Sequence, residues 1–236
     1  MTDPEAHHHE HDQHGHGGHH GHGHGHGHGH GNEHDQGFEA MLRYAKNARR
    51  MWTSAVNVAV VDALELTSID HLADIGAGVG AGASVAAAQA GQVFAVEPTP
   101  YMRRILSARS RLSRHPFAIV NGSAEATSLP DASMHAIMAV NTMHHWVDMD
   151  AACAELARVL RPDGRVLLVD ENFEDPTHPD HEAWTARHGS ENEHSHHFHM
   201  VDTEAIASKF ATAGLTVSSH GEGRFAHRPS WFVEIT

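Results

Sequence analysis

The feature that most constrains the fold is a short apolar stretch that ends near an acid and runs into a glycine-rich turn. It reads His71-Leu-Ala-Asp-Ile-Gly-Ala-Gly-Val-Gly80, and an alanine-rich pattern with helical spacing follows it. A strand, a glycine turn and a helix in this order are typical of α/β proteins in which a nucleotide-like ligand lies against the turn. Glycines let the backbone approach such a ligand and adopt dihedral angles that a side chain would forbid. The sequence therefore predicts a ligand site directly after the first strand.

The alternation of strand and helix patterns continues along the chain. Apolar stretches of strand length predict five strands, at Leu72–Ile75, Gln92–Val96, Phe117–Val120, Ala136–Asn141 and Arg165–Val169. The elements expected between them are helices at Gly80–Ala90, from Thr99-Pro100 onward and from Asp148 to Leu160, and a turn at Arg161-Pro-Asp-Gly164. Repeated units of this kind predict a doubly wound, Rossmann-like parallel sheet with helices on both faces.

Three further segments flank this pattern. Apolar residues recur at helical spacing from Phe38 to Leu66, which predicts one long helix or two. Near the C-terminus, Thr203–Ala213 is predicted to be a helix that Gly214 ends. The last two strands are expected at Leu215–Ser219 and Ser230–Ile235, joined through Gly221 and Gly223.

The first 36 residues differ in kind from the rest of the chain. They are almost entirely Gly, His and acid, and they hold half of the chain's 28 histidines. Such a composition cannot form a core, so residues 1–36 are expected to be a disordered tail and residues 37–236 one domain. Neutral imidazole is a good ligand for Zn, Ni and Cu, and the tail is therefore expected to bind divalent metal. An expression tag is the alternative, although the irregular mixture with Asp and Glu argues against it.

Composition limits the partners. The formal net charge of −14 makes nucleic acid an unexpected partner, because phosphate binding needs Lys and Arg clusters. Cys153 is the chain's one cysteine, which excludes an intramolecular disulfide. No apolar run is long enough to span a bilayer and the N-terminus is not signal-like, so no membrane contact and a cytoplasmic location are expected.

In a doubly wound sheet, ligands bind at the carboxyl ends of the strands. Polar or glycine residues follow every predicted strand at this edge, and they are Asp74, Gly76, Gly78, Glu97, Asn121–Glu125, Asn141–Trp146, Asp170 and Glu171. An acid about twenty residues after the glycine turn typically binds ribose hydroxyls, and Glu97 stands there. The glycine motif alone also fits a nicotinamide enzyme.

The combination of motifs resembles the class I S-adenosylmethionine-dependent methyltransferases, in particular the UbiE-like group. The residues that carry the resemblance are Asp74–Gly80, Val96–Pro98, Gly122–Glu125, Leu129-Pro130, Asn141–Trp146 and Leu156–Arg165. The resemblance implies a seven-stranded, mostly parallel sheet with an antiparallel C-terminal edge hairpin. It also implies S-adenosylmethionine as the methyl donor, and Asp74 with the Pro-Asp-Gly turn disfavours the nicotinamide alternative.

The family's roles carry over to individual residues. Asp74 and the backbone of Gly76, Ala77 and Gly78 would hold the methionine end of the donor, and Ala77 replaces a residue that is often Cys in related proteins. Glu97 would bind the ribose. The other implied contacts are to the adenine, from Pro98, Ser123, Ala124 and Glu125, and under the sulfonium, from Asn141. For Glu125 the alternative is a solvated acid before a turn.

Histidines mark the expected acceptor side. His144 and His145 follow the fourth predicted strand, and either is a competent base near neutral pH. The alternative is that one packs under the adenosine pocket and the other caps the next helix. Six more histidines are candidate ligands for a divalent metal such as Zn, Ni, Cu or Mg, and they are His178, His181, His194, His196, His197 and His199. A solvated polar insert, a storage site and a catalytic ion remain open for this segment.

Two function classes follow from these observations. The first is an enzyme that methylates a small molecule and carries a metal-binding tail. The second is a metal-handling protein, for Ni, Zn or Cu sequestration or tolerance, that uses a methyltransferase fold as a scaffold. Arsenic methylation usually needs several cysteines, so the single Cys153 argues against a metalloid methyltransferase. The methyl acceptor cannot be read from the sequence, and an oligomer is compatible with it.

Overall fold

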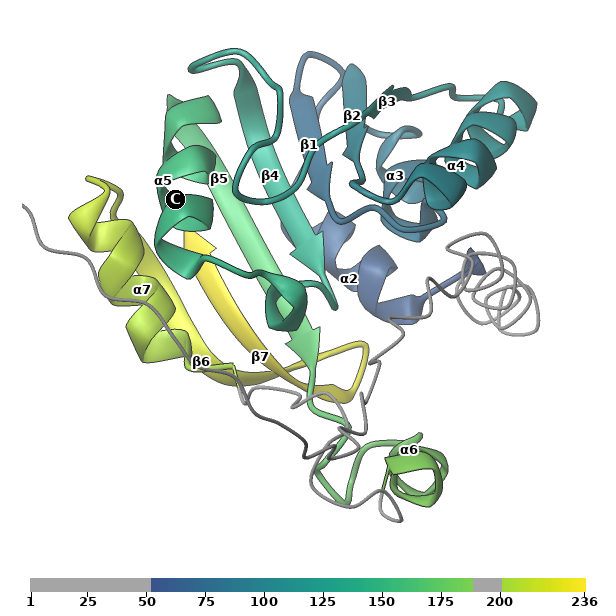
Figure 1. Cartoon of the computed structure of the whole chain (residues 1–236), viewed down its shortest axis with the longest axis vertical. Coiled ribbons are helices and arrows are strands. Elements are labelled where there is room, and N and C mark those ends of the chain that lie inside the picture. Colours follow the sequence, from purple (N-terminus) through teal and green to yellow (C-terminus); the bar gives the residue numbers. More distant parts are fainter. Residues whose placement is uncertain (1–51, 189–200) are drawn as a thin grey trace, which may run out of the picture.

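The computed structural model describes residues 52–188 and 201–236. The expected tail at residues 1–36 and the four histidines between His194 and His199 lie outside this part. Within it, one seven-stranded sheet has the order β3-β2-β1-β4-β5-β7-β6 (Figure 1). The strands are β1 (His71–Ile75), β2 (Gln92–Val96), β3 (Ala118–Val120), β4 (Met134–Val140), β5 (Leu160–Glu171), β6 (Val217–Phe225) and β7 (Arg228–Ile235). The α/β fold predicted from the repeated strand and helix patterns is confirmed.

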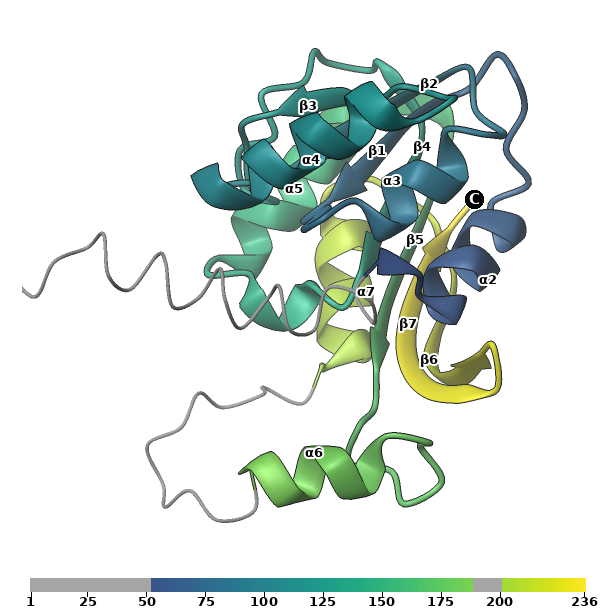
Figure 2. The same cartoon turned by 90° about the vertical axis from the view of Figure 1, so that its right-hand side faces the viewer.

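Helices cover both faces of the sheet (Figure 2). Their bounds are α2 (Ala55–Ala63), α3 (Ala81–Ala86), α4 (Pro100–Leu112), α5 (Met149–Val159), α6 (His181–His188) and α7 (Thr203–Thr212), with a 3-10 turn η1 (Met143–His145). One core cluster joins the sheet to α2, α3 and Leu106 of α4, and the other joins it to α5 and α7. This division arises because right-handed crossovers place helices on opposite faces as the strand order reverses next to β1. No helix in the described ranges is long and apolar enough to cross a membrane.

The C-terminal hairpin confirms the expected antiparallel pairing but not its connection. β5 pairs with β7, and β7 pairs with β6, both antiparallel. The prediction that Gly221 and Gly223 connect the two strands is wrong, because both glycines lie within β6. The turn lies instead at Ala226 and His227, whose φ angles are +49° and +65°. Two consecutive left-handed residues match the twist of the flanking strands, and this requirement decides the turn.

Two other boundaries also differ from the predictions. Arg161–Gly164 falls within β5, where Leu160 pairs with Met134 and Arg165 already pairs with Ala136. The four residues therefore form a bulge rather than a turn between separate elements. Ser54 has an extended backbone and its side chain accepts the N–H of Asn57, so α2 starts at Ala55 and ends at Ala63, three residues before the predicted end. Of the two alternatives for residues 38–66, this excludes the single helix and leaves the pair of helices.

Candidate active site

The glycine turn between β1 and α3 lies at the carboxyl ends of the parallel strands, as predicted. Gly76 and Ala77 donate their N–H groups to the carbonyl of Val96, which ties the turn to the end of β2. Gly76 has a φ of +69°, and a Cβ at this position would lie 2.7 Å from Cγ2 of Thr142. Both the backbone conformation and the neighbouring threonine therefore require glycine here.

Glu97 follows β2 and is hydrogen-bonded to the glycine turn. Its side chain is buried, its Oε2 accepts the N–H of Gly78 at 2.9 Å, and its Oε1 accepts the N–H of Thr99 at 2.8 Å. Each carboxylate oxygen has a further lone pair, so the group retains the capacity to accept hydrogen bonds from a vicinal diol. Pro98 is exposed beside it, and Arg103 donates to the carbonyls of Glu97 and Pro98.

Asp74 is the second acid next to this turn, and it is buried in β1 with 3% of its surface exposed. Its Oδ2 makes no hydrogen bond within the described part of the chain. Burial raises the pKa of Asp74 to about 7, the backbone N–H of Ala83 opposes this rise, and the negative charge of Glu97 adds to it. A buried polar atom without a partner costs about 1–3 kcal/mol. A cationic group bound at Asp74 would relieve that cost.

Glu125 is anchored in the protein rather than left as a solvated acid. Its Oε1 accepts the N–H groups of Val147 at 2.8 Å and of Asp148 at 3.5 Å. Burial raises the pKa of Glu125, but hydrogen bonds from Ser123 and from the 147–148 backbone outweigh burial, so the pKa lies below its usual range. Ala124 is buried beside it. Glu125 thus joins the loop after β3 to the start of α5, and its adenine contact stays a prediction.

Asp170, at the end of β5, organises the loop after β4. This buried carboxylate accepts the N–H groups of Thr142 at 2.9 Å and of Met143 at 3.3 Å through Oδ1. Its Oδ2 accepts the N–H of His144 at 3.1 Å and lies 2.7 Å from Nδ1 of the same histidine. Both oxygens of Asp170 accept backbone N–H groups, so the contact with His144 is best made by an N–H at Nδ1, and Nε2 is then the ring nitrogen that can accept.

The two adjacent histidines have different surroundings. His144 is 10% exposed in its side chain, whereas His145 is exposed, and their ring centroids lie 4.0 Å apart. The Nε1–H of Trp146 donates to Thr142 Oγ1 at 3.2 Å, which fixes the same loop from its other side.

Sequence reasoning noted Asp170 only as an acid that follows a strand and assigned it no role. Its strand-end position was the available signal, but its pairing with a histidine 26 residues away depends on the sheet.

The described residues do not assemble the expected histidine-rich metal site. His178 is buried, with Nε2 3.0 Å from Glu171 Oε2 and Nδ1 accepting the N–H of Asp180 at 3.0 Å. His181 directs Nδ1 to the carbonyl of Phe173 at 3.0 Å. No group of three or more His, Cys, Asp or Glu in ranges 52–188 and 201–236 is placed to hold a metal ion. The expectation for His178 does not fit these contacts, because both of its ring nitrogens are engaged within the protein.

The order of the seven strands and the glycine turn after β1 define the fold class, which is that of the α/β methyltransferases. A solved SAM-dependent methyltransferase from Aquifex aeolicus has the same fold, with a TM-score of 0.60 and 14% identity over 84% of this chain and 98% of that one. The family described as "Methyltransferase domain" matches residues 73–168. Residues 73–168 therefore form a methyltransferase domain, and the described part of the chain has the α/β fold of SAM-dependent methyltransferases.

Two curated relatives carry the same domain. Uncharacterized methyltransferase Rv3342 of Mycobacterium tuberculosis is 35% identical over 109 residues, which are 46% of this chain and 43% of that protein. Uncharacterized methyltransferase YcgJ of Bacillus subtilis is 32% identical over 119 residues, which are 50% of this chain and 47% of that protein. The chain thus spans less than half the length of these relatives.

Proposed function

We propose that this protein transfers the methyl group of S-adenosylmethionine to a small-molecule acceptor. The observation that carries the proposal is the pair of buried carboxylates, Asp74 and Glu97, beside one glycine turn. Two buried like charges favour a ligand that brings positive charge and hydroxyl donors. S-adenosylmethionine has an ammonium, a sulfonium and a ribose diol. A nicotinamide dinucleotide would instead bring an anionic pyrophosphate to the same place.

The residues fit the donor in the following way. Asp74 accepts hydrogen bonds from the ammonium, which supplies a partner for its buried Oδ2. The backbone of Gly76, Ala77 and Gly78 lies along the methionine, and Glu97 binds the ribose hydroxyls. The remaining donor contacts are to the adenine, from Pro98, Ser123, Ala124 and Glu125, and below the sulfonium, from Asn141.

His144 is the base of the proposed reaction, and Asp170 is its partner. The donor supplies an electrophilic methyl group on a positively charged sulfur. His144 Nε2 would take the proton that the acceptor's hydroxyl or amine loses on methylation. The buried Asp170 carboxylate, 2.7 Å from Nδ1, then stabilises the imidazolium. His145 is exposed and is the less favourable of the two predicted bases.

Calorimetry with S-adenosylhomocysteine tests the proposal directly. Wild-type protein should bind it, and Glu97→Ala should weaken binding at least about tenfold because the ribose acceptor is lost. Glu204→Ala is the matched control, since this glutamate is 84% exposed on α7. A wild-type protein that shows no binding at millimolar ligand, or a Glu97→Ala variant that binds normally, would refute the proposal.

We also propose that residues 1–36 bind divalent metal, because half of the chain's histidines lie there. Metal handling on a methyltransferase scaffold remains the second candidate function. In titrations of the full chain with Zn or Ni, the number of ions bound per chain should fall by more than half when the tail histidines are replaced by Gln. His178→Gln is the control, since its contacts to Glu171 and Asp180 leave neither ring nitrogen to a metal. Unchanged stoichiometry in the tail variant would contradict this proposal.

A further inference from the structure

Glu171, the last residue of β5, makes a two-sided contact with Asn141, which directly follows β4. Its backbone N–H donates to Asn141 Oδ1 at 2.7 Å, and its Oε1 accepts the Nδ2–H of Asn141 at 2.8 Å. Both functional groups of the asparagine side chain therefore bond to one residue of the neighbouring strand.

This contact sets an unusual backbone conformation. Asn141 has a φ of +57°, in the left-handed region, which asparagine adopts more readily than most residues but still at a cost relative to the ordinary regions. The two hydrogen bonds from Glu171 offset that cost. The next residue, Thr142, lies against Gly76 of the glycine turn and donates to the carbonyl of Ile75 at 3.4 Å. The conformation of Asn141 consequently decides how the loop after β4 meets the glycine turn.

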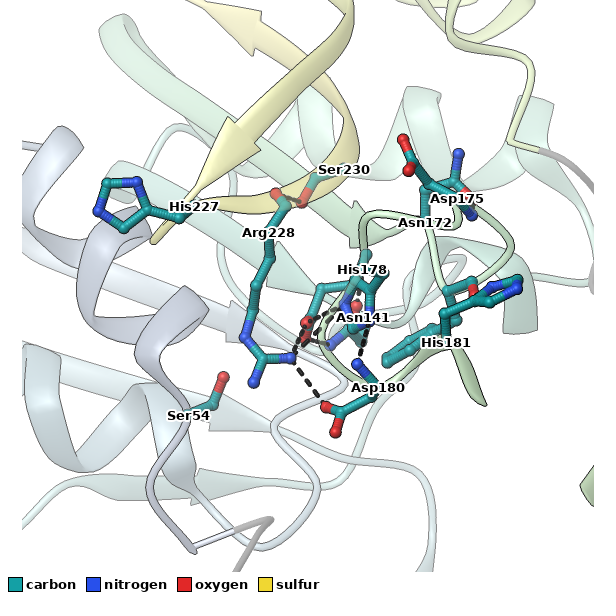
Figure 3. A network of polar contacts seen from close by, with 12 residues as sticks. Ser54, Asn141, Asn172, Asp175, His178, Asp180, His181, His227, Arg228 and Ser230 are labelled. Atoms are coloured by element: carbon teal, nitrogen blue, oxygen red, sulfur yellow. Dashed lines mark hydrogen bonds and ion pairs between the residues drawn. The ribbon is translucent and has the colours of Figure 1, made fainter. Parts of the chain in front are cut away.

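The other oxygen of Glu171 is held by Arg228, the first residue of β7, and by His178 in the segment after β5. Oε2 accepts from Arg228 Nη1 at 2.8 Å and lies 3.0 Å from His178 Nε2. His178 accepts the N–H of Asp180 on Nδ1, so its Nε2 carries the proton and donates to Glu171. Arg228 Nη1 also lies 3.0 Å from Asp180 Oδ2, which closes the network. Figure 3 shows His178, Asp180 and Arg228 converging on the Asn141 side.

We propose that Glu171, held by His178 and Arg228, is a positioning residue for the methionine end of S-adenosylmethionine. It acts through Asn141 and Thr142 and touches neither donor nor acceptor. The proposal rests on the proposed function, since it assumes that the donor binds along the glycine turn. It gives His178 a role in orienting Glu171 and makes the segment after β5 and the β6–β7 hairpin part of donor binding.

Single substitutions can remove one acceptor or one donor of the network around Glu171. Donors approach both oxygens: Asn141 Nδ2 on one side, and His178 and Arg228 on the other. Glutamine has only one acceptor oxygen, so Glu171→Gln leaves an N–H group facing another N–H group in either orientation. Arg228→Met removes one donor to Oε2. Glu204→Ala is the matched control, because this glutamate is 84% exposed on α7, outside the network around Glu171.

The test compares two ligands on the full chain by calorimetry. S-adenosylhomocysteine has the methionine end, whereas adenosine has only the part that Glu97 and the adenine contacts would bind. Glu171→Gln and Arg228→Met should each weaken S-adenosylhomocysteine about tenfold, as expected for one misplaced set of hydrogen bonds, and change adenosine by less than about twofold. Glu204→Ala should stay close to wild type for both ligands.

The outcomes distinguish a failure of donor binding from a failure of the positioning role. A wild type that binds neither ligand overturns the proposed function and this inference with it. A wild type that binds both, with Glu171→Gln and Arg228→Met unchanged, overturns only the positioning role. Equal weakening of both ligands, or a variant that fails to fold, assigns Glu171 to the fold alone and also overturns it.

Discussion

The buried acid in β1 predicts an unusual dependence of stability on pH. Asp74 has an ordinary pKa of 3.8 and a folded-state pKa of about 7, because burial, helped by the charge of Glu97, disfavours its ionised form. Between these two values the folded chain keeps a proton that the unfolded chain releases. Asp74 therefore makes the protein less stable as pH rises through this window, and above about pH 7 the full cost is present.

The magnitude follows from the size of the shift. Each pKa unit corresponds to about 1.4 kcal/mol, so the shift of Asp74 amounts to about 4 kcal/mol as an upper bound. Asp74→Asn removes the ionisation while nearly keeping the shape of the side chain. From about pH 5 to about pH 8, the free energy of unfolding of the wild type should fall by about 3 kcal/mol relative to the variant.

Urea denaturation of both proteins at several pH values measures this difference. Comparing the variant with the wild type cancels the other titrating groups, which the two proteins share. A stability difference that does not change with pH would refute the assignment of a raised pKa to Asp74.

The same residue makes a prediction about ligand binding. An ammonium bound at Asp74 favours the ionised carboxylate, so binding near pH 6 should release up to one proton from the wild type and none from Asp74→Asn. Calorimetry with S-adenosylhomocysteine in buffers of different ionisation enthalpy counts that proton. If the variant binds as tightly as the wild type, Asp74 does not hold the methionine end.

Three other perturbations test separate parts of the structure. Gly76→Ala should destabilise the fold by about 1–2 kcal/mol from its left-handed φ alone, and it should also weaken donor binding. Adding Thr142→Ser to this variant should recover part of both losses, because it removes the Cγ2 methyl that lies 2.7 Å from the new Cβ. Equal unfolding midpoints for the single and the double variant would contradict this. The pKa of Glu155 is lowered from 4.5 to about 2 by Arg158 and, despite burial, by hydrogen bonds from Thr127. This group should therefore contribute stability that is present above about pH 4.5 and lost as pH falls toward 2. Acid unfolding of Glu155→Gln should accordingly show a shallower loss of stability than that of the wild type. Cys153 is 1% exposed and burial raises its pKa to about 12, so thiol reagents should modify it only at the rate of unfolding, which fast labelling of the folded protein would disprove.

Local sequence patterns were sufficient for the elements of the fold and for one half of the site. The apolar run to Ile75, the glycine turn and the acid at Glu97 lie within 30 residues of each other, and their order along the chain already implies their arrangement. The N-cap at Asp148 and the proline at the start of α4 were likewise local signals, and the structure confirms both.

Elements whose ends depend on partners were predicted less well. The β6–β7 turn falls at Ala226 and His227 because β7 pairs with β6 in a register that leaves two residues between them. Gly221 and Gly223 looked like turn residues only because that pairing is invisible in the sequence. The bulge at 161–164 depends in the same way on the register between β4 and β5.

The sequence by itself determined the fold class and the acids next to the glycine turn, because each is encoded in local patterns, and it predicted the methyl donor through a family resemblance. Only the tertiary structure decided what Asp170, Glu171 and His178 do. Asp170 lies 26 residues from His144, Glu171 lies 30 residues from Asn141, and His178 lies 7 residues from Glu171. Parallel pairing of β4 with β5 brings the first two pairs together. His178 shows the difference most clearly, since composition placed it among metal ligands and its buried contact with Glu171 makes it a hydrogen-bond donor.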